Sequence, residues 1–92
     1  MTAKIAMLNP QTLGAAVRFH REAAGLSRHA LSELSGVGTT SIYDVEHGKG
    51  TVKFQTLLFI LEALSLEFKL EGPLMGRFWA THSASDIPDA HR

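Results

Sequence analysis

The chain has 92 residues, is 45% hydrophobic, and carries nine basic and nine acidic side chains, so its formal net charge is zero. This length accommodates one small domain with a single core. Because the sequence contains no cysteine, disulfides and thiolate metal sites are excluded. The apolar run Ile5 to Leu8 is too short for a secretion signal, and no stretch approaches the length of a membrane span, so we expect a cytoplasmic protein.

Charge is unevenly distributed along the chain. A neutral total argues against nucleic-acid binding, because neutralisation of phosphates supplies most non-specific affinity. The basic residues of the first part of the chain are Lys4, Arg18, Arg21, Arg28, Lys49 and Lys53. The acidic residues behind them are Glu62, Glu67, Glu71, Asp86 and Asp89. The first part is therefore the half in which a nucleic acid would bind.

The amino-terminal part contains an arm and a first helix. Residues 1–8 show no clear element: Ile5 and Met7 fit either a short strand or an arm, and the segment is interpreted as a partly ordered arm. A helix is predicted to begin at Asn9, which can cap it, with Pro10 tolerated in its first turn. It runs to about residue 24, and Gly25 ends it. Its predicted core face consists of Leu13, Ala16, Val17 and His20, and the histidine is interpreted as a core or boundary residue.

Residues 26–48 form the central pattern of the chain, two short helices joined by a tight turn. Ser27 can cap the first of them, and Gly36 ends it because glycine readily adopts the left-handed conformation of a sharp turn. The second helix is predicted over about residues 39–47. Its inward residues are Ile42 and Val45, and its outward residues are Thr39, Thr40, Tyr43 and Asp44. This is the layout of a helix-turn-helix, whose second helix enters the DNA major groove.

A further helix is predicted over about residues 54–64, after a loop. It is apolar on more than one face and therefore needs more than one neighbour. The second neighbour is either another subunit, which assigns Phe59 to a dimer surface, or the terminal tail folded back over it. Lys53, just before this helix, supplies no capping hydroxyl.

Residues 66–71 alternate between apolar and charged side chains, which is typical of a strand. The apolar members are Leu66, Phe68 and Leu70. Because one strand alone is not stable, we expect it to pair with its symmetry mate across a two-fold axis. The dimerisation strand is assigned to residues 66–72.

The remaining residues, 73–92, have no sustained periodicity and are expected to form a flexible tail. Phe78 and Trp79 are unusual in such a segment. They either cover the strand or the preceding helix, or they form a docking motif that orders when a partner protein binds.

An ordered set of these signals extends over the middle two-thirds of the chain. It comprises Leu13, Gly14, Arg18, Arg21, Gly25, Leu26, Ser27, Leu31, Gly36, Val37, Ile42, Glu46, Gly48 and the segment from Leu57 to Leu64. The set resembles the Cro/repressor-type (XRE family) helix-turn-helix domains, and a strand directly after the last long helix is similar to the HipB-like antitoxins among them. The resemblance implies a mainly α fold, a four-to-five-helix repressor-like domain over residues 9–65. One short C-terminal β-strand would pair across a homodimer.

The resemblance also implies an ion pair between Arg21 and Glu46, which would tie the first helix to the end of the recognition helix. A partly buried pair adds little net stability, yet removing one partner costs about 3–5 kcal/mol. Arg21 is therefore predicted to be structural and not a DNA contact.

Two paired copies would present their recognition helices roughly 34 Å apart, which matches an inverted-repeat operator. The predicted base contacts are the outward residues Thr39, Thr40, Tyr43 and Asp44. Threonine can contact a thymine methyl, whereas an aspartate can only accept from a cytosine or adenine amino group. The family usually has glutamine, lysine or arginine at positions 38–40, so shape or water is expected to carry part of the specificity. The predicted phosphate contacts are Arg28, Gly38, Ser41, His47, Lys49, Thr51 and Lys53.

These features favour a homodimeric, sequence-specific DNA-binding transcriptional repressor, an antitoxin that autoregulates a toxin-antitoxin operon. Its partners would be double-stranded operator DNA and a cognate toxin. Two alternatives are a stand-alone repressor-type regulator and a protein-interaction module that inhibits a partner without binding DNA. We expect neither enzymatic activity nor a cofactor or metal, because the histidines lack metal-ligand spacing and the glycines form no phosphate-binding loop.

Overall fold

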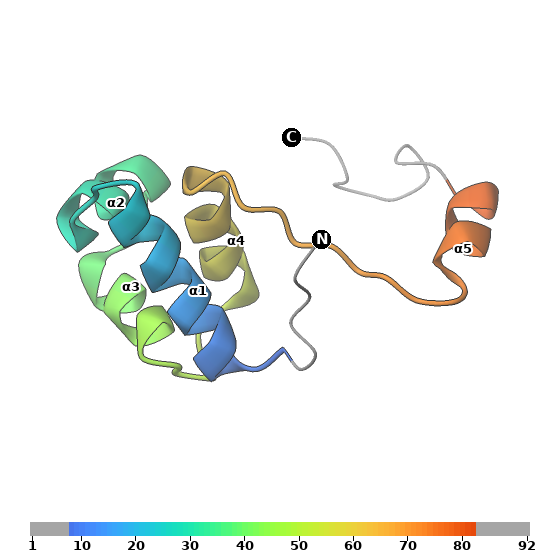
Figure 1. The fold of residues 1–92 in the computed structure, drawn as a ribbon, viewed down its shortest axis with the longest axis horizontal. Coiled ribbons are helices and arrows are strands. Elements are labelled where there is room, and N and C mark those ends of the chain that lie inside the picture. The colour runs from blue at the N-terminus through green and yellow to red at the C-terminus, as the bar shows by residue number, and fades with distance from the viewer. Residues whose placement is uncertain (1–7, 83–92) are drawn as a thin grey trace.

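The computed structural model describes residues 8–82. The helices in this range are α1 (Pro10–Ala23), α2 (Arg28–Ser35), α3 (Thr39–Glu46), α4 (Phe54–Ala63) and α5 (Met75–Thr81). The first four pack together, whereas α5 lies apart at the end of a helix-free segment (Figure 1). The prediction of a mainly helical helix-turn-helix fold is confirmed.

Local capping interactions fix where the first two helices begin. The Asn9 side chain accepts a hydrogen bond from the Thr12 amide at 2.9 Å, and the Thr12 hydroxyl accepts one from the Asn9 amide at 3.2 Å. The Ser27 hydroxyl likewise accepts from the Ala30 amide at 3.0 Å. Such caps satisfy amides that have no partner within the helix. At the other end of α2, Gly36 has a φ of +74°, which turns the chain sharply toward α3.

The core lies where α3 packs against the other three helices of the domain. Its fully buried side chains are Val17, Leu31, Ile42 and Ile60. Each contributes about 1.5–3 kcal/mol through removal of apolar surface from water. Because every helix of the domain supplies one of these residues, α3 is held at a fixed orientation.

Helix α1 crosses α3 closely at Gly14. A Cβ atom at this position would overlap the backbone carbonyl oxygen of Val45. The buried face of α1 consists of Gly14, Val17 and Arg21. The prediction that His20 belongs to this face is wrong: its ring is exposed, with Nδ1 2.7 Å from the Ala16 carbonyl oxygen, because the buried stripe passes through residue 21 instead.

The predicted strand at residues 66–71 is not formed within the described part of the chain. A strand needs a hydrogen-bonded neighbour, and residues 8–82 place none beside it. Leu66 instead packs against the core, and the Phe68 ring lies 5.7 Å from the Phe54 ring. Pairing across a dimer therefore stays a prediction.

The C-terminal part differs in one respect from the flexible tail expected over residues 73–92, since it includes the seven-residue helix α5. Residues 83–92, and residues 1–7 of the expected arm, lie outside the described residues. No helix within residues 8–82 is long and apolar enough to span a membrane.

Candidate nucleic-acid interface

Helix α3 has one buried face and one exposed face. Ile42 and Val45 are buried, whereas Thr39, Thr40 and Tyr43 are exposed. The structure therefore places three of the four predicted base contacts on the same outward surface. A helix held by its inner face, with short polar and aromatic side chains outside, has the form required to enter a major groove.

Asp44, the fourth predicted base contact, is half-buried and lies beside a predicted phosphate contact. Its Oδ2 is 3.4 Å from Lys49 Nζ, and its carbonyl oxygen accepts from the Lys49 amide at 2.9 Å. An exposed ion pair of this kind adds little stability. The pair changes the charge of the surface instead, because Lys49 partly neutralises Asp44, the acidic residue of α3 that is not buried.

Tyr43 is surrounded by two further residues from the predicted interface. Its ring stacks on that of His47, with centroids 3.8 Å apart and planes 19° apart. Arg28, which opens α2, places its Cζ 5.2 Å from the Tyr43 ring centroid, within the range of a cation–π interaction. We call Arg28, Tyr43 and His47 the Tyr43 cluster.

Glu46 connects this cluster to the interior of the domain. Its side chain is fully buried and accepts from Arg21 Nε at 2.6 Å and from Arg28 Nε at 3.1 Å. Arg21 also donates to the Leu26 carbonyl oxygen at 2.8 Å. Helices α1, α2 and α3 therefore meet at one carboxylate, and every buried side-chain nitrogen and oxygen among the described residues has a hydrogen-bond partner.

Two opposing effects set the pKa of Glu46. Burial raises it, but hydrogen bonds from Arg21 and Arg28, together with their charges, outweigh burial and lower the pKa below its ordinary value. The hydrogen bond to Glu46 in turn raises the pKa of Arg21, against the effect of burial. Glu46 is therefore held in its ionised form.

The structure places Arg21 and Glu46 together as an ion pair, but it adds a partner that sequence reasoning missed. Arg28 lies 18 residues before Glu46, and its Nε donates to the Glu46 carboxylate, whereas the phosphate contact that the sequence predicts for Arg28 stays a prediction. No local pattern signals the bond to Glu46, because it depends on how α2 packs against α3.

The other predicted phosphate contacts surround α3 and the loop after it. Gly38 and Lys53 occupy the N-cap positions of α3 and α4, and neither forms a side-chain capping bond. Thr51 and Lys49 are exposed, whereas Ser41 is half-buried. Helix N-terminal amides without a side-chain cap can bind phosphate oxygens, so these positions are compatible with the prediction.

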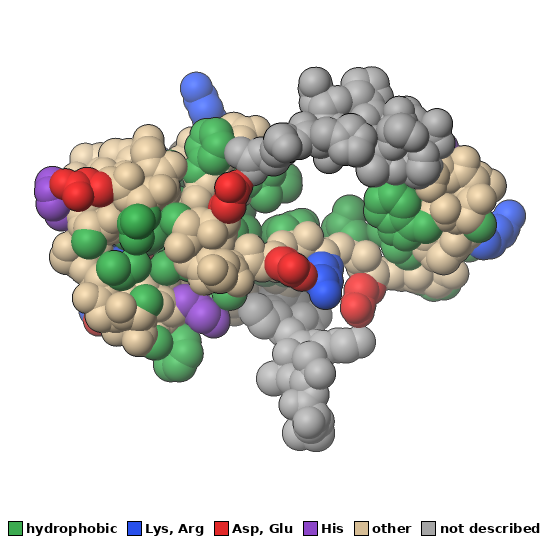
Figure 2. All heavy atoms as spheres, turned by 90° about the horizontal axis from the view of Figure 1, so that it is seen from above, with side chains coloured by type: hydrophobic (Ala, Val, Ile, Leu, Met, Phe, Trp, Pro, Cys, Tyr) green, Lys and Arg blue, Asp and Glu red, His purple; other side chains and the backbone are tan. Residues whose placement is uncertain are grey.

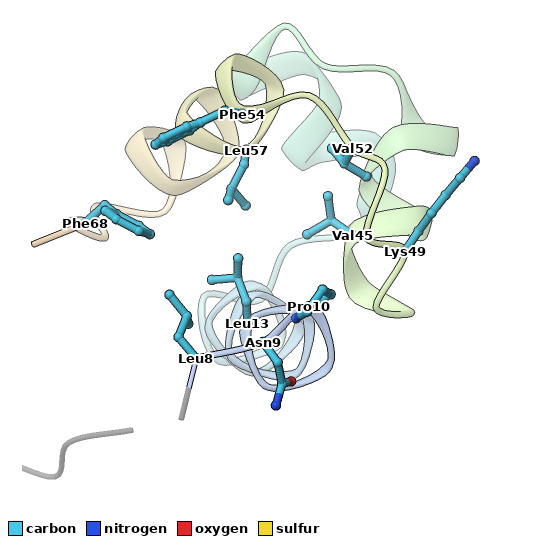
Figure 3. Close-up of a pocket in the computed structure, with 11 residues that line it drawn as sticks. Leu8, Asn9, Pro10, Leu13, Val45, Lys49, Val52, Phe54, Leu57 and Phe68 are labelled. Carbon is cyan, nitrogen blue, oxygen red and sulfur yellow. The ribbon is translucent and has the colours of Figure 1, made fainter. Parts of the chain in front are cut away.

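An apolar pocket of about 360 Å³ lies behind the interface, between the start of α1, the loop after α3 and the start of α4 (Figure 3). Leu13, Val45, Leu57 and Phe68 are among the residues that line it. A second, more open groove of about 1090 Å³ extends from Phe54 along residues 68–79. Phe68 thus lies at the boundary of both hollows.

The residues predicted for dimerisation and partner docking are distributed over the α4 surface and the C-terminal segment. Phe59 is partly exposed on α4, whereas Phe68 and Leu70 line the second groove. Phe78 and Trp79 also line it, with rings 4.8 Å apart in a T-shaped pair. Hydrophobic side chains are exposed on α5 and along the adjoining segment (Figure 2).

Comparison with known proteins identifies the domain. A family described as "Helix-turn-helix domain" matches residues 12–67. The chain belongs to this helix-turn-helix family. The predicted resemblance to XRE-type domains is thereby confirmed. Members of this family are typically not enzymes.

Individual relatives agree with the family assignment. The chain is 33% identical over 64 residues to "Uncharacterized HTH-type transcriptional regulator y4mF" of Sinorhizobium fredii (strain NBRC 101917 / NGR234), covering 70% of this chain and 84% of that protein. It is similar in fold to the "HipB-O4 20mer complex" and to "MDT Protein", each with a TM-score of 0.68 and 21% identity. Both alignments cover 76% of this chain and 99% of the other.

The helix-turn-helix match separates two parts of the molecule. It includes the Glu46 ion pairs, the Tyr43 cluster and the whole of α4, but ends at residue 67. The apolar segment with α5 lies beyond it. The candidate interface therefore belongs to the part of the chain that the family shares, whereas α5 lies outside that part.

Proposed function

We propose that this chain is a sequence-specific DNA-binding transcriptional repressor. The observation that carries the proposal is the division of α3 into a buried face and an exposed face, with Thr39, Thr40 and Tyr43 outside. Membership of the helix-turn-helix family and the relative described as a transcriptional regulator support it. The exposed residues would contact base edges, and the cations near α3 would contact phosphates.

We further propose that the repressor binds as a homodimer to an inverted repeat. Support comes from the exposed apolar side chains of Phe68 and Leu70, which follow the domain directly. In a dimer, residues 66–72 of two copies would pair as antiparallel strands, which gives each strand the neighbour it lacks in one chain.

The antitoxin role rests on α5 and on the HipB-like fold. Phe78 and Trp79 are partly exposed on a helix with no buried residue, beyond the region matched by the family. Exposed aromatic side chains on a short helix are typical anchors for a partner protein. A toxin encoded beside this gene would dock there, and the complex would repress their common operon.

The DNA-binding proposal is tested by titrating the purified protein against its own upstream promoter DNA in gel shifts. A scrambled duplex serves as the control for specificity, and each titration is repeated at a second salt concentration. We expect specific binding that weakens with salt and a footprint with two-fold symmetry. Equal binding to the scrambled duplex would contradict the proposal.

Alanine substitutions distinguish the repressor from the alternative, a protein-interaction module that does not bind DNA. The variant with alanine at Thr39, Thr40 and Tyr43 should lose specific binding while its oligomeric state and helical content are retained. A matched variant with alanine at Phe78 and Trp79 should bind DNA as the wild type does. If the α3 variant keeps every function in the cell, the repressor assignment is wrong.

The antitoxin proposal is tested by co-expression with the products of adjacent reading frames. A toxin partner should co-purify with the wild type and with the α3 variant, and should be lost when Phe78 and Trp79 are alanine. If that variant still co-purifies with the partner, the proposal that the toxin docks on α5 is wrong.

A further inference from the structure

Arg28 is half-buried and is tied to a buried carboxylate, so it is not a free surface cation. Its Nε donates to the fully buried Glu46 carboxylate at 3.1 Å. The same carboxylate is held by Arg21 through two bonds, from Nε at 2.6 Å and from Nη2 at 3.1 Å. Because Glu46 is fixed from α1, it fixes in turn the position from which the Arg28 guanidinium extends.

The guanidinium extends over Tyr43. Its Cζ lies 5.2 Å from the ring centroid, while His47, the C-cap residue directly after α3, stacks on the ring with centroids 3.8 Å apart. His47 is itself held, with Nδ1 2.8 Å from the Tyr43 carbonyl oxygen. Tyr43 nevertheless keeps about half of its surface exposed, so it remains accessible while contacts from α2 and α3 restrict its rotation.

We infer that Arg28 is a positioning residue that determines base specificity through Tyr43, by holding its ring ready for the major groove. This inference rests on the DNA-binding function proposed above. A side chain that is ordered before binding loses less conformational entropy in the complex and accepts fewer alternative bases. Arg28 would therefore affect discrimination between sequences more than overall affinity.

The inference differs measurably from the phosphate contact that the sequence predicts for Arg28. Loss of a phosphate contact weakens binding to all duplexes alike and reduces the slope of log affinity against log salt by about 1. Loss of a positioning residue leaves that slope unchanged and reduces the ratio of specific to non-specific affinity.

The experiment is a double-mutant cycle with Arg28→Met, Tyr43→Ala and the double variant. The probes are the footprinted operator from the upstream promoter DNA, its single base-pair substitutions and a scrambled duplex, each over a salt series. Lys49→Met is the matched control, because Lys49 is a neighbouring cation outside the Tyr43 cluster. It should weaken binding to all duplexes and lower the salt slope.

We expect Arg28→Met to reduce the specific to non-specific ratio about tenfold, the size of one base contact, with an unchanged salt slope. Tyr43→Ala should do the same at the same base pairs, and the double variant should lose no more than either single one. Additive losses, or a salt slope lowered as in Lys49→Met, would overturn the inference in favour of a phosphate contact.

Arg28→Lys keeps the test decisive if the methionine variant does not fold. Lysine keeps a positive charge beside Glu46 and can bind phosphate, but its single ammonium cannot both bond Glu46 and lie over the ring as the planar guanidinium does. We expect the ratio of specific to non-specific affinity of Arg28→Lys to be several-fold below that of the wild type, at an unchanged salt slope. A ratio equal to that of the wild type would refute the inference. If the wild type itself shows no specific binding, the proposed function has failed instead.

Discussion

The domain formed by α1 to α4 has an interior of completely buried apolar side chains, whereas the segment of residues 64–82, which follows α4 and carries α5, has no buried side chain. In the domain, Leu31 and Ile42 are completely buried. In the segment, Leu70 and Leu74 are 71% and 64% exposed, and none of the residues of α5 is buried. Stability therefore resides in the domain, whereas the apolar side chains of the segment are available for association.

The largest expected effect tests the interior of the domain. Replacing Arg21 by Met leaves the buried Glu46 carboxylate with only Arg28 as a charged partner, so we expect the free energy of unfolding to fall by about 3–5 kcal/mol. Urea unfolding followed by circular dichroism measures it. Arg18→Met is the matched control, since the pair that Arg18 forms with Glu22 at 3.4 Å is exposed, and it should cost less than about 0.5 kcal/mol. Equal effects of the two variants would mean that the Glu46 pair does not stabilise the domain.

The second prediction compares two helical glycines, one in each region. Gly14→Ala places a Cβ against the backbone of α3 and should destabilise the domain by about 1–3 kcal/mol. Gly76→Ala, in α5, meets no atom within 4 Å and should instead favour the helix by up to about 1 kcal/mol. Thermal unfolding measures the first and helical content by circular dichroism the second. A neutral Gly14→Ala variant would show that α1 and α3 separate without cost.

The third prediction concerns pH. Because the pKa of Glu46 is lower in the folded chain, its contribution to stability is complete above its ordinary value of 4.5 and is lost as the pH falls through the folded value. Stability of the wild type should therefore decrease below about pH 4.5, and Glu46→Gln should lack this part of the decrease. The measurement is urea unfolding at a series of pH values from 3 to 7. If the free energy of unfolding falls with pH equally in the wild type and in Glu46→Gln, the decrease does not come from Glu46.

The helices of the domain are predictable from sequence because capping residues and apolar spacing are local features, each within a few residues of the helix concerned. Asn9 and Ser27 cap α1 and α2 as expected, and Gly36 ends α2 in a left-handed conformation. The same locality predicts which residues of α3 face outward, since Ile42 and Val45 alone provide its apolar spacing. The order of elements and the helix-turn-helix therefore follow from the sequence.

The features that the sequence did not predict depend on packing between distant elements. The bond from Arg28 to Glu46 joins α2 to α3, and His20 is exposed because the buried stripe of α1 passes through Gly14, Val17 and Arg21. Periodicity gives a buried stripe but not its exact boundary, so it assigns His20 to the wrong side. The predicted strand at residues 66–71 is a different case: it does not form within residues 8–82, and its pairing with a second chain stays a prediction.

The smallest expected effect tests the C-terminal segment. Trp79 has a larger side chain than any core residue, yet it is 55% exposed, and its described ring contact is with Phe78 in the same helix. Trp79→Ala should therefore change the free energy of unfolding of the domain by less than about 0.5 kcal/mol, as is usual for surface positions. Ile60→Ala, which removes a smaller but completely buried side chain, should cost about 2–5 kcal/mol in the same urea titration. If Trp79→Ala proves as costly as Ile60→Ala, the segment folds onto the domain in solution, and the distinction between a stable domain and an available surface is wrong.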